Sequence, residues 1–161
     1  MSAERPADCC ETVDDAGTFC PLSGHAGLVV GALPVRAHRP TAVAGRWRYC
    51  PNRACEIVFF LDDDIGGDIV DDQEVICQVG AKALTKPTPV CFCFAHTVED
   101  IRIDVATHDG SSTIMAKVKA AVADVRCACE HLNPSGVCCL PAVHRAVTMA
   151  RQQISGGVAG G

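Results

Sequence analysis

Twelve cysteines in 161 residues dominate the chemistry of this sequence. Most of them lie in closely spaced groups, in segments 9–20, 50–55, 91–93 and 127–139. The N-terminal segment is polar and lacks the apolar core of a secretory signal, so the sequence predicts a cytoplasmic protein with reduced thiols. Reduced thiols at short spacing are typical of soft-metal ligands, with a disulfide framework as the alternative interpretation. We therefore expect metal-thiolate chemistry.

Two cysteine blocks flank predicted helix starts. Cys91 and Cys93 precede a capping-box pattern formed by Thr97 and Asp100, and a second block, residues 127–139, ends directly before a helix start marked by a proline. Four thiolates around two ferric and two sulfide ions leave a net negative charge, which the positive end of a helix stabilises. The blocks predict an iron–sulfur site. The spacing alone does not choose between the two cysteines at either end of the second block.

A Cys-x4-Cys turn joins two predicted strands at Cys50 and Cys55. A pair at this spacing is within the range of half of a structural zinc site, and the rest of the site is expected upstream, near Cys20. The alternative is a turn that binds no metal and is stabilised by packing of its apolar neighbours.

The Cys-x-Cys pair, the distant cysteine and the Asn-Pro-x-Gly-x-Cys-Cys sequence at residues 133–139 resemble the N-terminal domain of CopZ-type copper chaperones. The helical part of that domain is similar to the [2Fe–2S] domain of bacterioferritin-associated ferredoxin. The resemblance extends from about residue 20 to residue 154. It implies that a [2Fe–2S] cluster is bound by Cys91, Cys93, Cys129 and Cys139.

The same resemblance places a Cys-Pro-x-Cys half-site at residues 20–23, where this sequence has Ser23 in place of the second cysteine. A closed zinc site needs four ligands, so the missing one is expected from Cys10, Cys9 or His25. We predict that Zn²⁺ is bound by Cys10, Cys20, Cys50 and Cys55.

The hydrophobic pattern predicts an α+β fold. Short β-branched runs at residues 27–35, 46–50, 56–61 and 74–79 predict strands, and helical periodicity begins near residues 98, 113 and 140. We expect a small β zinc-knuckle module over residues 1–88. A helical [2Fe–2S] module similar to bacterioferritin-associated ferredoxin is expected over residues 89–154, followed by a disordered tail, 155–161.

These expectations favour a protein of electron transfer and copper or other soft-metal handling, similar to a CopZ-type chaperone without its C-terminal copper-loop domain. Cu(I) is a further candidate ligand, and a copper chaperone, a copper-exporting ATPase or a redox protein is the expected partner. A net charge of −5 argues against nucleic acid, and no apolar stretch is long enough to span a membrane. No catalytic motif is present, so an enzyme is not favoured. The alternatives are a metal-folded interaction module and a thiol- or cluster-based metal-ion reductase.

Overall fold

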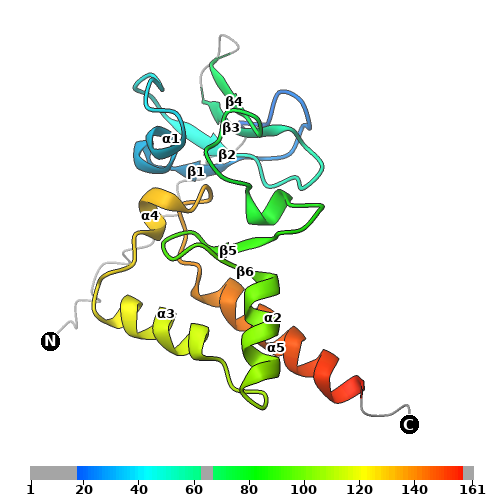
Figure 1. The fold of residues 1–161 in the computed structure, drawn as a ribbon. Helices are drawn as coiled ribbons and strands as arrows, with labels where there is room; N and C mark the ends of the chain where they lie inside the picture. The colour runs from blue at the N-terminus through cyan, green and yellow to red at the C-terminus, as the bar shows by residue number, and fades with distance from the viewer. Residues whose placement is uncertain (1–17, 63–66, 158–161) are drawn as a thin grey trace, which may run out of the picture.

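The computed structural model describes residues 18–62 and 67–157, which form an antiparallel sheet and, beside it, a group of helices (Figure 1). The sheet has the order β1-β2-β3-β4, with every pair antiparallel. The expected α+β class is therefore confirmed. The strands are β1 Leu28–Val30, β2 Trp47–Tyr49, β3 Ile57–Leu61 and β4 Ile69–Asp71.

Two of the predicted strands are wrong in part or whole. The run at 27–35 leaves the sheet after Val30 and forms helix α1, Ala32–His38. Pro34 lies in the first turn of that helix, where a missing N–H group costs no hydrogen bond. The run at 74–79 forms no strand, because the chain pairs with β3 earlier, through β4. The Asp71 carboxylate then accepts hydrogen bonds from the next amides along the chain and ends the strand in a turn.

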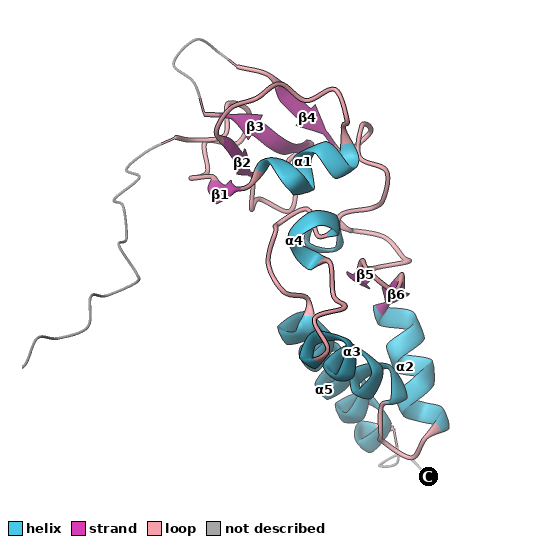
Figure 2. Cartoon of the chain, turned by 90° about the vertical axis from the view of Figure 1, so that its left-hand side faces the viewer, coloured by secondary structure: helices cyan, strands magenta, loops and turns pink. Residues whose placement is uncertain are grey.

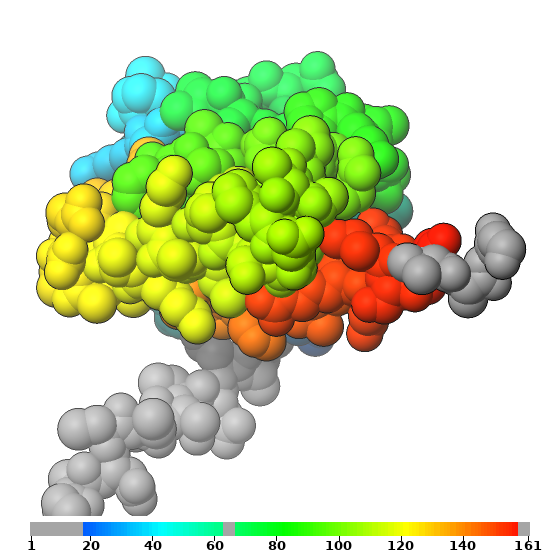
Figure 3. All heavy atoms as spheres, turned by 60° about the horizontal axis from the view of Figure 1, so that its bottom comes forward, coloured from blue at the N-terminus to red at the C-terminus, as the bar shows by residue number. Residues whose placement is uncertain are grey.

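Three longer helices form a hydrophobic core of their own, separate from the core packed against the sheet. They are α2 Val98–Thr107, α3 Thr113–Ala123 and α5 Leu140–Gly156, and Figure 3 shows them together on one face. The predicted capping box is confirmed, because Thr97 Oγ1 accepts from the Asp100 amide at 3.1 Å and Asp100 accepts from the Thr97 amide at 2.9 Å. The core between these helices consists mainly of small and β-branched side chains: Ile101, Val105, Ile114, Val118, Val143, Ala146, Val147 and Ala150.

The C-terminal helix is longer than expected. Ser155 and Gly156 continue α5, so the predicted tail at 155–161 is wrong for these two residues. Residues 158–161 lie outside the part of the chain that the structure describes. None of the described helices is both long and apolar enough to cross a membrane.

Short elements join the sheet to the helices. A 3-10 turn η1, Gly80–Lys82, leads to a hairpin of β5, Pro89–Cys91, and β6, His96–Thr97. Helix α4, Cys129–Leu132, returns to the sheet side and packs on α1 (Figure 2). Nε2 of buried His38 donates to the Leu132 carbonyl at 3.2 Å across this contact. The predicted modules 1–88 and 89–154 are therefore in contact through α1 and α4, in addition to being joined by the chain near residue 88.

Candidate metal centres

The first centre lies at the turn that joins β2 to β3, where Cys20, Cys50 and Cys55 meet. Their sulfur atoms all lie within 4.8 Å of one another, and the Sγ atoms of Cys20 and Cys55 are 3.7 Å apart. Two thiolates bound tetrahedrally to one zinc ion at ~2.3 Å would be separated by ~3.8 Å. All three side chains are buried. The structure thus brings together three of the four predicted zinc ligands.

Hydrogen bonds around these thiols distinguish Cys20 from Cys55. Burial opposes ionisation of Cys20, but hydrogen bonds from Ser23, from the Leu22 amide and from Cys50 lower its pKa to about 7. Burial raises the pKa of Cys55. Cys20 therefore ionises more readily than Cys55, which would release its proton on metal binding.

The position of the fourth zinc ligand is only partly defined. Ser23 Oγ lies 3.4 Å from Cys50 Sγ, on the side where the related motif would have its cysteine. His25 is absent from the group of close donor atoms, and its Nδ1 donates to the Ser23 carbonyl at 3.1 Å instead. Cys9 and Cys10 lie outside the described residues.

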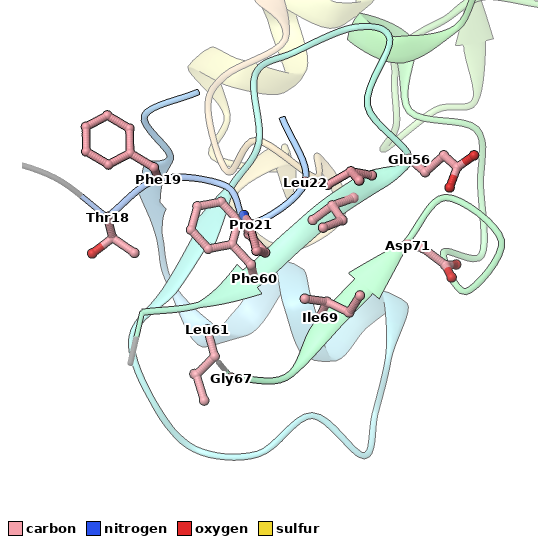
Figure 4. A pocket seen from close by; sticks show the side chains of 11 residues that line it. Thr18, Phe19, Pro21, Leu22, Glu56, Phe60, Leu61, Gly67, Ile69 and Asp71 are labelled. Atoms are coloured by element: carbon pink, nitrogen blue, oxygen red, sulfur yellow. The ribbon is translucent and has the colours of Figure 1, made fainter. Parts of the chain in front are cut away.

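An apolar pocket of about 480 Å³ adjoins this centre (Figure 4). Phe19, Pro21 and Leu22, which flank the buried Cys20, line it together with Phe60 of β3. Thr18, the first residue that the structure describes, also lines this pocket.

The second centre lies between the hairpin and the helices. Cys91 ends β5, Cys93 lies in the hairpin turn, Cys129 begins α4 and Cys139 is the N-cap of α5. The Sγ atoms of Cys93 and Cys129 are 3.7 Å apart, and the thiol of Cys139 hydrogen-bonds Cys91. The structure thus brings the four predicted cluster ligands into one connected group.

Backbone amides point at several of these sulfur atoms. The Ala128 amide donates to Cys93 Sγ at 3.1 Å, and the Cys139 amide donates to Cys129 Sγ at 3.4 Å. The hydrogen bond from Cys139, helped by the amides of Phe94 and Cys93, lowers the pKa of Cys91 to about 6. Burial raises the pKa of Cys129 to about 12, and the pKa of Cys139 is raised by its bond to Cys91. Four thiols with amide donors fit the ligand set of an anionic iron–sulfur cluster.

A tight turn brings Cys139 back to Cys129. The Gly136 amide donates to the Asn133 carbonyl at 2.8 Å, and Gly136 has a φ of 70°, which favours glycine. Asn133 also accepts from the Ser135 amide at 3.1 Å and donates to the Val137 carbonyl at 2.9 Å. The turn predicted at residues 133–136 is therefore present and reverses the chain between two of the thiols.

The structure separates the cysteines that the sequence left open. Cys138 is exposed, next to buried Cys139. Cys127, by contrast, belongs to the second centre, because its sulfur lies within 4.8 Å of those of Cys93 and Cys129. Cys77 belongs to neither group of close donor atoms, and burial raises its pKa. All ten cysteines in the described part of the chain are free, so no disulfide forms among them.

One residue that the sequence did not single out stabilises the turn of the first centre. The Lys82 ammonium donates to the carbonyls of Asn52 and Cys55 in the knuckle turn, at 2.7 and 3.0 Å. It also lies 5.8 Å from the centre of the Tyr49 ring. Lys82 belongs to η1, which precedes the hairpin that carries Cys91 and Cys93. A lone lysine in an irregular segment gives no sequence signal for this role.

Comparison with known proteins supports the resemblance seen in the cysteine motifs. No protein-family model matches the chain. It is 29% identical over 124 residues to the copper chaperone CopZ of Archaeoglobus fulgidus, which covers 74% of this chain but only 57% of CopZ. Its structure is similar to the X-ray structure of the CopZ N-terminal domain, with a TM-score of 0.59, 28% identity and coverage of 80% of this chain and 96% of that domain. The chain is thus similar to CopZ in sequence and in the fold of its N-terminal domain.

Proposed function

We propose that this chain transfers electrons and handles copper in the cytoplasm, through a [2Fe–2S] cluster on Cys91, Cys93, Cys129 and Cys139. The observation that carries this proposal is the convergence of these four thiols from separate elements: the hairpin, α4 and the start of α5. Burial of three of the four side chains supports a metal centre over isolated reactive thiols. Similarity of the helical part to the domain of bacterioferritin-associated ferredoxin belongs to the same proposal.

The residues around this centre suit a redox cofactor. When bound, such a cluster supplies one-electron chemistry at a potential set by hydrogen bonds to sulfur and by exposure. The amides of Ala128 and Cys139 donate to ligand sulfur atoms and would favour the reduced, more negative state. The 17-residue helix α5 begins directly after Cys139, and its positive end would act in the same direction.

We further propose that Zn²⁺ on Cys20, Cys50, Cys55 and Cys10 has a structural role. The three described thiols are buried at the turn that joins β2 to β3 and pack in one cluster with Ile57 and Phe60. A buried thiolate site of this kind contributes its binding energy to folding. In this proposal the zinc ion and the two hydrogen bonds from Lys82 both stabilise the turn between Cys50 and Cys55.

The copper part of the proposal rests on the likeness to CopZ, of which the chain spans 57%. Soft thiolates bind Cu(I) preferentially, and both centres offer them. A groove of about 990 Å³ reaches Cys138 and Cys139 and includes Arg53 and Arg145 in its wall. We propose this groove as the approach for a redox partner, a copper chaperone or a copper-exporting ATPase.

A dye-mediated redox titration of the anaerobically purified protein tests the electron-transfer role. The proposal expects one reversible one-electron transition of the visible spectrum, with the same midpoint in both directions. A protein whose metals only stabilise the fold would show no reversible transition, and that result would refute the proposed function.

A further inference from the structure

The second centre contains one more thiol than a four-ligand cluster uses. Cys93, Cys127 and Cys129 have sulfur atoms that all lie within 4.8 Å of one another. Cys93 and Cys129 are also proposed cluster ligands, whereas Cys127 is not. Two of the sulfur atoms, those of Cys93 and Cys129, are already 3.7 Å apart, a separation suited to binding one metal ion.

Two metal-binding sets therefore overlap at Cys93 and Cys129. We propose that Cys93, Cys127 and Cys129 form a second site, for Cu(I), that shares two thiolates with the [2Fe–2S] cluster. Three thiolates form a soft ligand set that Cu(I) accepts, and they are too few for a closed tetrahedral zinc site. Because each thiolate can fully serve only one of the two groups, copper and the cluster are alternatives at this centre. The inference rests on the proposed function, since it assumes the cluster ligands named above.

The three-thiolate set includes the two more solvent-exposed thiols of the second centre. Cys93 and Cys127 are half-buried, whereas Cys91 and Cys139 are only 1% and 2% exposed. A copper ion delivered from solution or by a partner would meet the first pair before the second. The third thiol of the set, that of Cys129, is buried.

The turn that presents Cys127 is built at a conformational cost. At the end of α3, the Arg126 amide donates to the Ala121 carbonyl at 2.8 Å and the Val125 amide to the Val122 carbonyl at 3.1 Å. This C-cap motif normally has glycine at its left-handed position, yet Val125 occupies it with a φ of 53°. Its side chain is 88% exposed, so packing does not compensate for the strain of a β-branched residue there. The strained turn lies two residues before Cys127, whose sulfur atom lies within 4.8 Å of that of Cys93.

The test follows cluster absorbance while Cu(I) is added to the holoprotein under anaerobic conditions, with bicinchoninate setting the free Cu(I) concentration. Copper entering the three-thiolate site takes Cys93 and Cys129 from the cluster, so the absorbance falls and iron appears in the filtrate. Cys127→Ser should need at least ~10-fold more free Cu(I) for half bleaching, because one of three ligands is lost and the loss of a residue that merely supports a ligand already costs ~10–100-fold in metal affinity. Cys138→Ser, which changes an exposed thiol of the same block, should bleach as the wild type does.

Two results would overturn the inference, and they differ in what else they affect. If the Cys127→Ser protein holds its cluster but bleaches at the wild-type Cu(I) concentration, copper attacks elsewhere, and the proposed function is untouched. If Cys127→Ser is purified without iron while its circular dichroism is normal, Cys127 is itself a cluster ligand. The second result would also refute the ligand set of the proposed function.

Discussion

Replacing Gly80 by alanine should disturb the second centre from a distance. Gly80 begins η1, and a Cβ atom added there would lie 1.9 Å from the carbonyl oxygen of Pro89, the first residue of β5. Real Cβ atoms essentially never approach within 3.0 Å, so η1 and β5 must separate by roughly 1 Å. The obstacle is backbone and cannot rotate away. Strand β5 would therefore move, together with Cys91 at its end.

The size of the effect follows from the kind of clash. Overpacking of a well-packed site costs about 1–3 kcal/mol, and a clash with backbone belongs at the upper end. A loss of about 3 kcal/mol corresponds to a fall in Tm of roughly 6–12 °C for a chain of this size. Displaced ligands should also lower the iron content per chain. Thermal unfolding by circular dichroism and iron analysis on the same anaerobic sample measure both effects.

Gly156→Ala provides a matched control. A Cβ atom at Gly156, in α5, would meet nothing within 4 Å, and alanine favours a helix over glycine by up to ~1 kcal/mol. This variant should keep its iron and have an equal or higher Tm. If Gly80→Ala also retains wild-type Tm and iron, the close packing of η1 on β5 does not position the cluster ligands.

Four further substitutions probe the centres and the contact between the modules. Cys139→Ser should lose most of its iron and sulfide, because this thiol is buried against Cys91, whereas Cys138→Ser should retain them; the reverse pattern would invalidate the ligand assignment. Cys50→Ser should lower the Tm and the zinc content while the visible spectrum persists, and a colourless variant would show that the two centres are coupled. Burial lowers the pKa of His38, so the unfolded chain binds the proton first and the free energy of unfolding falls as the pH drops through about 6.5. Urea titrations between pH 8 and 5.5 should show a smaller fall for His38→Gln than for the wild type, and equal slopes would contradict the buried, neutral state.

Local signals in the sequence were the most informative about the fold. The capping box at Thr97 and the start of α5 near Pro141 each depend on residues within one helical turn, and each is present. Strand β4 depends instead on pairing with β3, a long-range contact without a periodic signature. The run at 74–79 had the better strand composition, but no strand forms there. Helix α4 has only four residues, too few to show periodicity.

The candidate site was predictable to the level of thiol groups. Spacing located both groups, and the resemblance to CopZ-type domains chose among adjacent cysteines. The structure adds burial, which separates Cys138 from Cys139, and proximity, which joins Cys127 to Cys93. The second of these could not be predicted, because it depends on a left-handed turn at Val125, where sequence rules expect glycine.

The most direct test of the central claim is anaerobic purification followed by a visible spectrum and an iron, sulfide and zinc count on one sample. Our account predicts a red-brown protein with iron and sulfide in equal amounts, about two of each per chain, and about one zinc ion. A colourless protein that contains zinc alone would contradict the electron-transfer role.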